Sequence, residues 1–305
     1  MNKIAITTGD PNGIGAEITI KSLRKLNLPS DKFVLISNRK ILEYYGDKLN
    51  EYEIVEIPYD YNDIKPGNVT KEAGEFAFQS LKKVCELSPK AIVTAPVAKS
   101  SIHLAGHNFN GQTEILEKYL SHDNQLAEML FVAGSFRVLL LTRHCPLKEV
   151  DLTIDLVVKK IQNLANTFKK HFKIENPRFA LCGFNPHSGE DGILGKEEID
   201  ILIPAVEKLR NFGINISYPK PADTLFVNAA KYYFEGKRDY YDCYIANYHD
   251  QGLIPIKTVA GDKTVNTTIG LDIIRTSPGH GTAFDIAGKN IARPDSMIEA
   301  IRQVL

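Results

Sequence analysis

The sequence predicts an α/β protein with a largely parallel sheet and helices on both of its faces. Two observations carry this prediction. Short apolar, β-branched runs recur along the chain, and segments of helical periodicity lie between them. The length of 305 residues allows a sizeable core and favours two sub-domains over one.

The first part of the chain supplies three of the expected strands and two helices. The strands are KIAITTG (3–9), FVLIS (33–37) and AIVTAP (91–96), each a short run of apolar and β-branched residues. A first helix is expected near residues 14–26. A second runs from Thr70, a suitable N-cap, to about Leu87, because its apolar residues recur at helical spacing: Ala73, Phe76, Ala77, Leu81 and Val84.

The rest of the chain continues the alternation. Apolar runs predict strands at 129–133, 136–142, 178–183 (RFALCG) and 243–247 (CYIAN). Longer periodic segments predict helices at 153–171 and 196–211. No internal repeat, low-complexity segment or long linker separates these elements, so the sequence places a domain boundary poorly.

Charge and composition exclude several classes of function. Positive and negative side chains balance at 37 each, which argues against a nucleic-acid-binding surface or an acidic tail. The absence of a leader and of an apolar stretch near 18 residues predicts a soluble, cytoplasmic protein without a membrane partner. The cysteines have no CxxC spacing, which argues against a zinc ribbon or a redox pair and favours reduced, mostly buried thiols.

Three of the expected strands end in a histidine. His144, His187 and His249 each follow a different apolar run, and ligands of open α/β sheets bind beyond the carboxyl ends of the strands. Three imidazoles with open coordination positions suit a catalytic divalent metal such as zinc. The alternative for each residue alone is a loop histidine without a ligand.

Another histidine pair has a spacing that binds metals on helices. His103 and His107 are four residues apart. Gly106 and the following NFNGQ make such a helix short, so we interpret this pair as structural.

Downstream of His249, the chain carries residues that suit a phosphate or carboxylate group. Lys257 follows the apolar run LIPI, and Asn266 and Arg275 lie in the β-branched segments TVNTTIG and DIIRTSPG. A point charge, an amide and a planar guanidinium together form a suitable anion site. Most such charges are solvated surface groups, but an apolar setting would make an unpaired charge costly.

The segment TTGDPNGIGAE lies between an expected strand and an expected helix, as a phosphate-binding loop does. It lacks the G-x-G-x-x-G pattern, and Asp10 would place a negative charge beside a pyrophosphate. We therefore expect a turn that lines the ligand cleft, with Asp10 available to a cation or an amine.

Seven motifs together identify a resemblance over nearly the whole chain. They are GDPNGIG (9–15), TAPVAK (94–99), GQTE (111–114), NPHSGE (185–190), PADTLF (221–226), YHDQGL (248–253) and VNTTIGL…IRTS (265–277). The sequence resembles the 4-hydroxythreonine-4-phosphate dehydrogenase family, the PdxA family of vitamin B6 biosynthesis. The combination of NPHSGE, PADTLF and YHDQGL is highly specific, whereas any single motif would not be.

The resemblance implies a fold similar to isocitrate and isopropylmalate dehydrogenases, with two α/β/α domains and a cleft between them. We expect residues 1–112 and 270–305 to form the first domain. Residues 113–269 would form the second, with the metal-binding histidines and the contacts of a homodimer. The resemblance also implies an active site at the subunit interface, where one metal ligand, expected to be His249, comes from the partner subunit.

The resemblance assigns roles to specific residues. The metal ligands would be His144, His187 and His249, holding Zn, Mg or Co. The phosphorylated substrate would contact Lys257, Asn266, Arg275 and the pair Gln112–Thr113. Gln112 stands where the family usually has histidine, and glutamine carries no charge and shuttles no proton. Asp250 and Asp223 are candidates for the general base, and either could instead orient a metal-bound imidazole.

A further segment, GHGTAFDIAGK, is similar to the cofactor segment of isopropylmalate dehydrogenases. It places His280, Gly281, Thr282, Ala283 and Asp285 beside a nicotinamide dinucleotide. A carboxylate at Asp285 favours NAD over NADP, because it accepts a hydrogen bond from a ribose 2′-hydroxyl and repels a 2′-phosphate. The alternative interpretation of GHGTA is a tight glycine turn before a helix.

The implied reaction is the metal- and NAD(P)-dependent oxidation of 4-phosphohydroxy-L-threonine. The β-keto acid product, 2-amino-3-oxo-4-phosphooxybutanoate, then decarboxylates to 3-amino-2-oxopropyl phosphate, on the route to pyridoxal phosphate. Gln112 motivates an alternative, the same chemistry on a phosphorylated sugar acid such as threonate or erythronate 4-phosphate. A phosphate acyltransferase and a metal-dependent phosphohydrolase are further alternatives, and neither accounts for the cofactor-like segment.

Overall fold

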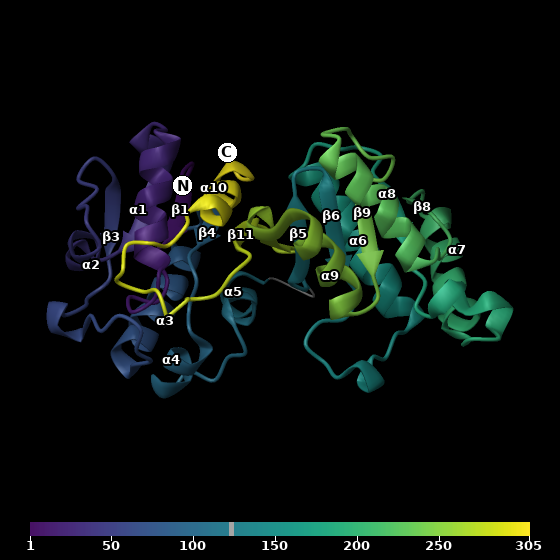
Figure 1. The fold of residues 1–305 in the computed structure, drawn as a ribbon, viewed down its shortest axis with the longest axis horizontal. Helices are drawn as coiled ribbons and strands as arrows, with labels where there is room; N and C mark the ends of the chain where they lie inside the picture. Colours follow the sequence, from purple (N-terminus) through teal and green to yellow (C-terminus); the bar gives the residue numbers. More distant parts are fainter. Residues whose placement is uncertain (122–124) are drawn as a thin grey trace. The chain divides into compact units, whose positions relative to one another are not determined.

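The computed structural model describes residues 1–121 and 125–305, and the chain forms two compact units. The first unit comprises Met1–Ala127 and Val265–Leu305, and the second comprises Glu128–Thr264. Figure 1 shows the elements of each unit along the chain. The expected boundaries after residues 112 and 269 differ from these. Helix α5 (Gln112–Leu120) belongs to the first unit, because its Ile115 and Leu116 are buried in the core of that unit.

The described part of the first unit contains six strands. Its elements are β1 (Ile4–Thr7), α1 (Gly15–Leu26), β2 (Phe33–Ser37), α2 (Arg39–Tyr44), β3 (Glu53–Glu56), α3 (Lys71–Glu86), β4 (Ala91–Thr94), α4 (Lys99–Leu104), α5, β10 (Val265–Ile269), β11 (Arg275–Pro278) and α10 (Asp295–Arg302). The strand order is β3-β2-β1-β4-β11-β10. All neighbours in it are parallel except β10, which is antiparallel to β11.

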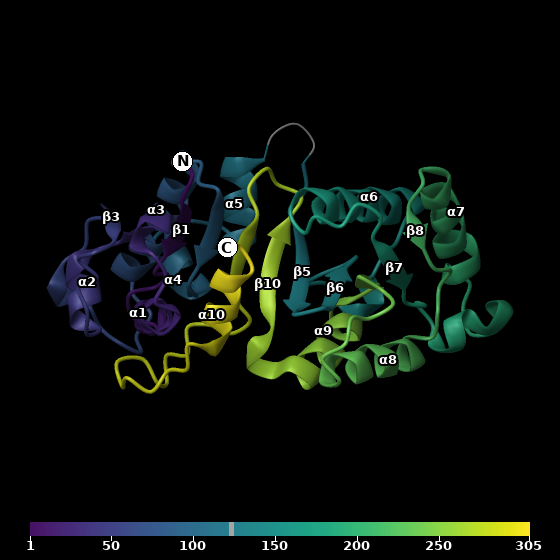
Figure 2. The same cartoon turned by 90° about the horizontal axis from the view of Figure 1, so that it is seen from above.

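Both faces of this sheet are covered by helices. Ile4 and Ile6 of β1 are buried in a cluster with residues of α1 and α10, whereas Ala5 between them is buried in a cluster with residues of α3 and α5. Figure 2 shows α1 and α10 on one side of the strands and α3 and α5 on the other. Successive side chains of a strand point to opposite faces, so a strand between two helical layers must be apolar throughout.

The second unit is built on five strands. Its elements are β5 (Glu128–Ala133), β6 (Phe136–Leu140), α6 (Ile154–Lys170), β7 (Arg178–Leu181), α7 (Ile203–Asn211), β8 (Asn215–Ile216), α8 (Ala222–Phe234), β9 (Cys243–Ala246) and α9 (His249–Ala260). The order is β5-β6-β9-β7-β8, in which β5 is antiparallel to β6 and the other neighbours are parallel.

The second unit also has helices on two sides. Phe136, Val138 and Leu140 of β6 are buried in a cluster with residues of α8 and α9. The side chain of Arg137, between them in sequence, lies over the ring of Phe168 of α6. Figure 2 shows α6 on one side of these strands and α8 and α9 on the other. The alternation along β6 therefore again assigns each face to its own helices.

The structure confirms the α/β class and the largely parallel sheet. It also confirms the expected strands and helices, with ends that differ by a few residues, and the Thr70 hydroxyl accepts a hydrogen bond from Ala73 N (3.2 Å) as an N-cap. The run LIPI belongs to helix α9, not to a strand or loop. Cys85, Cys182 and Cys243 are buried free thiols, but Cys145 is exposed. Within the described ranges, the structure contains no helix that is both long and apolar enough to span a membrane.

Candidate active site

Strands β6, β9 and β7 bring the expected metal ligands to one edge of the second unit. The three strands are adjacent and parallel, so their carboxyl ends lie at the same edge of the sheet. His144 follows β6, His249 is the first residue of α9 after β9, and His187 lies in the turn after β7 (186–192). His249 is half-buried, and the other two histidines are exposed.

Two of these histidines lie close together. The rings of His144 and His249 have centroids 5.5 Å apart and an interplanar angle of 49°. Two imidazoles that share one zinc ion through bonds of about 2 Å have centroids roughly 5 Å apart, so the pair fits a common metal ion. The Nδ1 of His249 pairs with Asp250 Oδ1 at 2.7 Å, which leaves its Nε2 available to a metal.

His187 lies on a stretch of unusual backbone. Residues 187–191 all have positive φ values, between 43° and 80°, although only Gly189 lacks a side chain. Left-handed backbone costs about 1 kcal/mol or more for each residue with a side chain, so the surrounding structure must hold this turn in place. Among residues 1–121 and 125–305, no three His, Cys, Asp or Glu side chains are close enough to bind one metal ion. The structure therefore brings His144 and His249 together but not His187.

The residue that holds the start of the His187 turn, Glu198, was not predicted from the sequence. Glu198 is 3% exposed, and its Oε1 accepts hydrogen bonds from the backbone N–H of Phe184 (2.7 Å) and of Asn185 (2.8 Å). Its Oε2 accepts a third hydrogen bond, from Asn185 Nδ2 (2.9 Å). A signal for it exists in the sequence. Glu198 stands four residues before Leu202, at an apolar position of the helical pattern, and a carboxylate there must be buried with partners.

In the first unit, Arg275 is a buried cation without a carboxylate partner. Its side chain is 3% exposed, and no ion pair involves it within the described part of the chain. Nε and Nη2 donate to Thr94 Oγ1 (2.9 and 2.6 Å), and Nη1 donates to Thr268 Oγ1 (3.2 Å). Burial lowers the pKa of Arg275 to about 10, and Glu114 opposes the shift only in part. The guanidinium therefore stays charged at neutral pH in a site that suits an anion.

Other expected substrate residues lie near the same strand end of the first unit. Gln112 opens helix α5 and donates through Nε2 to the carbonyl of Ala95 (3.3 Å), directly after β4. Its Oε1 is buried without a hydrogen-bond partner in the described chain, and so is Oδ1 of Asn266 on β10. Thr113 is buried in the first turn of α5. Thr94 and Ala95 thus connect Arg275 and Gln112 to the end of β4.

Lys257 does not have the apolar setting that the sequence suggested. It is exposed in the last turn of α9, because LIPI forms a helix whose opposite face is buried. Eight residues of helix separate it from His249, a rise of about 12 Å. The apolar setting expected for both cations is therefore wrong for Lys257 and correct for Arg275.

The expected cofactor segment packs against the glycine-rich loop of the first unit. The carbonyl of Thr282 accepts a hydrogen bond from Ile14 N (3.0 Å), and a Cβ at Gly13 would lie 3.0 Å from the Cβ of Thr282. Ala283 has a positive φ of 43°. His280, Gly281 and Asp285 are exposed. The glycines of residues 9–15 therefore allow close packing of backbone on backbone.

The structure corrects the expectation that Asp10 lines a ligand cleft and is available to a cation or an amine. The Asp10 side chain is fully buried, and Oδ1 accepts a hydrogen bond from Asn12 N (2.9 Å). Burial raises the pKa of Asp10, because desolvation outweighs that hydrogen bond. Asp10 thus closes a local turn and does not line a cleft. Both candidates for the base, Asp223 in the first turn of α8 and Asp250, are exposed.

The pair His103 and His107 has separate partners, as expected for structural residues. His107 Nε2 pairs with Glu75 Oε2 (2.7 Å), and its ring stacks on Phe78 with centroids 3.6 Å apart. His103 Nε2 lies 3.0 Å from the carbonyl of Phe109.

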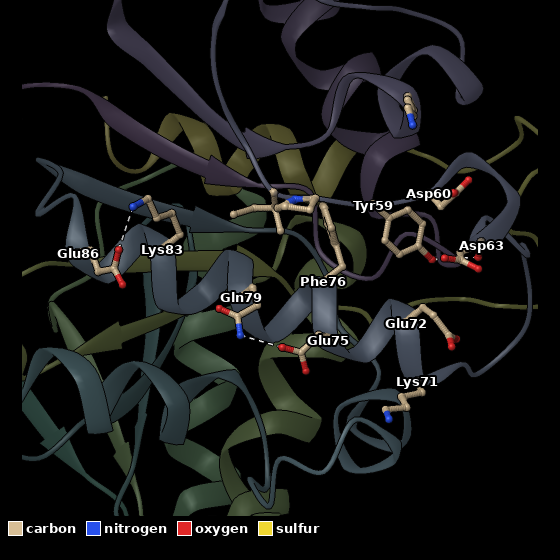
Figure 3. A pocket seen from close by; sticks show the side chains of 13 residues that line it. Tyr59, Asp60, Asp63, Lys71, Glu72, Glu75, Phe76, Gln79, Lys83 and Glu86 are labelled. Atoms are coloured by element: carbon tan, nitrogen blue, oxygen red, sulfur yellow. Dashed lines mark hydrogen bonds and ion pairs between the residues drawn. The ribbon is translucent and has the colours of Figure 1, made fainter.

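A pocket of about 980 Å³ lies along α3 in the first unit, and none of the expected site residues lines it. Figure 3 shows Phe76 and the charged side chains of α3 along one side of the pocket and Tyr59, with Asp60 and Asp63 beside it, at another. Lys83 pairs with Glu86 (2.9 Å), and Gln79 donates to Glu75 (2.7 Å). Because none of the predicted metal, substrate or cofactor residues lines this pocket, we do not assign the active site to it.

Comparison with known proteins decides the family. Residues 5–304 match the family described as "Pyridoxal phosphate biosynthetic protein PdxA". The chain belongs to this PdxA family. A 4-hydroxythreonine-4-phosphate dehydrogenase of Sulfurihydrogenibium sp. is 38% identical over 323 residues, which cover 99% of this chain and 97% of the relative. A D-threonate 4-phosphate dehydrogenase of Pectobacterium atrosepticum is 37% identical and covers 98% and 97%. The resemblance inferred from the motifs is confirmed.

Solved structures agree with the fold. The crystal structure of 4-hydroxythreonine-4-phosphate dehydrogenase from Klebsiella pneumoniae matches with a TM-score of 0.85 and 34% identity, covering 99% of this chain and 97% of that one. Isocitrate dehydrogenase from Methylococcus capsulatus matches with a TM-score of 0.52 and 14% identity, covering 100% and 85%. The second match shows a shared fold alone, and it confirms the expected likeness to isocitrate dehydrogenases.

Proposed function

We propose that the chain oxidises 4-phosphohydroxy-L-threonine at C3 with NAD and a divalent metal ion, and that the product decarboxylates to 3-amino-2-oxopropyl phosphate. The family and the names of its members support a dehydrogenase of a small phosphorylated substrate. Buried Arg275 carries the proposal, because its unpaired charge suits the substrate phosphate.

His144 and His249 would hold the metal ion, with His187 as the third ligand. A bound divalent ion supplies Lewis-acid polarisation of a hydroxyl group. Asp250 holds Nδ1 of His249 and so directs Nε2 toward the ion. We therefore assign Asp250 a positioning role and retain Asp223 as the candidate base.

These two assignments predict different kinetics. Asp250→Asn would weaken metal binding by about 10- to 100-fold and leave the pH profile of kcat unchanged at saturating metal. Asp223→Asn would lower kcat by a factor of about 10² to 10⁴ and remove one limb of that profile. The reverse pattern would exchange the roles.

Thr113, Gln112 and Asn266 would assist Arg275 in binding the phosphorylated substrate, and Lys257 would contribute a distant charge. Gln112 and Asn266 support this assignment, because each has a buried oxygen without a hydrogen-bond partner in the described chain. Such an oxygen accepts a hydrogen bond from an ammonium or a hydroxyl group of a ligand.

The cofactor would bind along His280, Gly281, Thr282, Ala283 and Asp285, with a preference for NAD. Gly281 offers a clean test, since a Cβ there would have no atom within 4 Å and its φ is not in the left-handed region. Gly281→Ala would therefore leave the melting temperature unchanged and weaken NAD binding where the dinucleotide approaches the backbone. Unchanged NAD affinity in this variant would remove Gly281 from the cofactor site. Asp285→Ala would reduce the preference for NAD over NADP.

A spectrophotometric assay for NADH tests the whole proposal. Purified protein with 4-phosphohydroxy-L-threonine and NAD would form NADH in the presence of Zn²⁺, Mg²⁺ or Co²⁺, and a chelator would stop the reaction. No NADH with any of these ions would refute the proposal.

D-threonate 4-phosphate is the second candidate substrate. A relative at 37% identity carries that name, and the free oxygen of Gln112 can accept a hydrogen bond from the hydroxyl of threonate as well as from the ammonium of the threonine derivative. Comparing kcat/KM for the two substrates would distinguish them. Erythronate 4-phosphate belongs in the same assay.

We further propose a homodimer in which one metal ligand comes from the partner subunit. His144 and His249 lie together within one chain, so we assign the exchanged ligand to His187. Mixing the inactive variants His144→Ala and His187→Ala after subunit exchange would then restore activity, because one of the two sites in a mixed dimer is intact. No restoration would place all three ligands in one subunit. A cytoplasmic location stays a prediction.

A further inference from the structure

Asn247 and Gln251 flank His249 and form the centre of a hydrogen-bond network in the second unit. Asn247 is fully buried between β9 and α9, and Gln251 is half-buried in the first turn of α9. Gln251 Oε1 accepts hydrogen bonds from Asn247 N (2.7 Å) and Asn247 Nδ2 (3.2 Å). The two amides thus close the turn that carries His249.

The network reaches the end of β7, where the His187 connection begins. Asn247 Nδ2 donates to the carbonyl of Cys182 (2.9 Å), and Gln251 Nε2 donates to the carbonyl of Gly183 (2.7 Å). Two consecutive carbonyls are therefore held by two amides, which fixes both the position and the direction of the chain as it leaves the sheet.

The network also reaches the end of β6, which leads to His144. The carbonyl of Asn247 accepts hydrogen bonds from Thr142 Oγ1 (2.7 Å) and from Thr142 N (3.2 Å). Thr142 lies two residues before His144. All three strand ends that precede a histidine are therefore joined through Asn247 and Gln251.

Asn247 has one feature that stability does not explain. Its Oδ1 is buried and has no hydrogen-bond partner in the described chain. An unpaired buried acceptor costs about 1–3 kcal/mol and offsets part of what the two hydrogen bonds donated by Nδ2 contribute. Unsatisfied polar groups of this kind are rare in native proteins and concentrate where function requires a particular geometry.

We propose that Asn247 and Gln251 are positioning residues that hold the three histidine-bearing strand ends in register, with His144 and His249 for the metal site of the same subunit and His187 for that of the partner, and thereby set the affinity for the metal ion. The inference rests on the proposed metal site at His144 and His249. It goes further in naming residues that touch neither metal nor substrate. Residues behind metal ligands typically change metal affinity by about 10- to 100-fold when they are altered.

Gln251→Glu is the first test, because it keeps an oxygen for Asn247 N and replaces the donor to Gly183 O by a second acceptor. Thr142→Val is the second test, since it removes the hydroxyl bond to Asn247 O from a residue that is not fully buried. Thr142→Ser is the matched control that retains the hydroxyl. Calorimetric titration of metal-free protein with Co²⁺ gives the dissociation constant, and the visible spectrum of bound Co²⁺ reports its coordination.

We expect about 10- to 100-fold weaker Co²⁺ binding and an altered spectrum in Gln251→Glu and Thr142→Val, with Thr142→Ser close to wild type. NAD binding, which we assign to the first unit, should not change in any of the three. If both altered variants bind Co²⁺ like the wild type, or if their NAD binding falls in the same proportion, the positioning role is refuted. His144→Ala separates this result from the proposed function: Co²⁺ binding that survives this substitution refutes the metal site itself.

Discussion

Replacing Arg275 by methionine separates a binding role from a structural one. Methionine fills a similar volume without a charge, and the variant loses the three hydrogen bonds that the guanidinium donates to Thr94 and Thr268. A residue that binds the substrate phosphate and a residue that supports the fold respond to this substitution in opposite ways.

The structure sets the magnitudes. Burial lowers the pKa of Arg275 from the usual value of a guanidinium to about 10, which corresponds to a desolvation cost on the order of 3 kcal/mol for the charged form. Three hydrogen bonds to threonine hydroxyls return about 1 kcal/mol each, so the two contributions nearly cancel in the free energy of unfolding. The substrate complex has no such compensation. Loss of a desolvated charge pair costs about 2–5 kcal/mol, or roughly 30- to 5,000-fold in affinity.

Two measurements check the prediction. Urea unfolding of Arg275→Met should give a free energy within about 1 kcal/mol of wild type, whereas KM for the phosphorylated substrate should rise at least about 30-fold. Arg137→Met is the matched control. Arg137 lies over the rings of Phe168 and Phe172 in the second unit, so this variant should lose stability and keep KM. A large loss of stability with unchanged KM in Arg275→Met would refute the phosphate role.

Three further predictions address the fold. Burial lowers the pKa of His171 at the end of α6 from 6.5 to about 4, so the protein should lose stability as the pH drops from 6.5 toward 4. Since the ring is partly exposed, we expect a loss on the order of 1 kcal/mol in the free energy of unfolding. The urea midpoint of His171→Gln should change less with pH over that range than the midpoint of the wild type. Glu198→Gln should lower the free energy of unfolding by about 1–3 kcal/mol and speed hydrogen exchange across 184–192. The neighbouring Glu197, which is more exposed and also accepts from Asn185 Nδ2, is the control, and Glu197→Gln should change the free energy of unfolding by less than about 0.5 kcal/mol. Gly252→Ala would place a Cβ 2.6 Å from Leu140 Cδ2 and 2.8 Å from Val138 Cγ1. The free energy of unfolding should therefore fall by about 1–3 kcal/mol, and the melting temperature should fall with it. An unchanged melting temperature would show that α9 shifts freely against β6.

The sequence predicts the fold well, because in both units the strands are buried between helices on the two faces of the sheet. Strands such as β1 and β9 lie between two helical layers, so they are apolar on both faces and stand out from the periodic helices. Helix α9 was not predicted from the sequence pattern. Its segment holds Gly252 and Pro255, which disfavour a helix locally, and close packing of Gly252 against β6 overrides that preference.

The candidate site is predictable where topology alone decides it. The carboxyl ends of adjacent parallel strands must share one edge, which is why His144 and His249 lie together. Burial is not decided this way. Lys257 and Arg275 both follow apolar runs, but Lys257 lies on the exposed face of a helix, whereas Arg275 is the first residue of a strand inside the sheet. Asp10 and Glu198 are likewise buried through contacts with chain that the local pattern does not reveal.

Several unsatisfied groups lie at the strand ends, and others, such as Glu17 Oε2 and Gln303 Oε1, lie elsewhere in the described chain. Arg275 has a buried charge without a counter-ion, and Gln112, Asn266 and Asn247 each have a buried oxygen without a partner in the described chain. Each buried oxygen lowers the stability of the free protein by about 1–3 kcal/mol, whereas the desolvation cost of Arg275 is nearly balanced by its hydrogen bonds to Thr94 and Thr268. A sequence selected for stability alone would replace such groups by apolar residues of similar size. A ligand that supplies an anion to Arg275 and donors to the oxygens regains these contributions as binding energy, so the same residues that weaken the free protein would strengthen its complex.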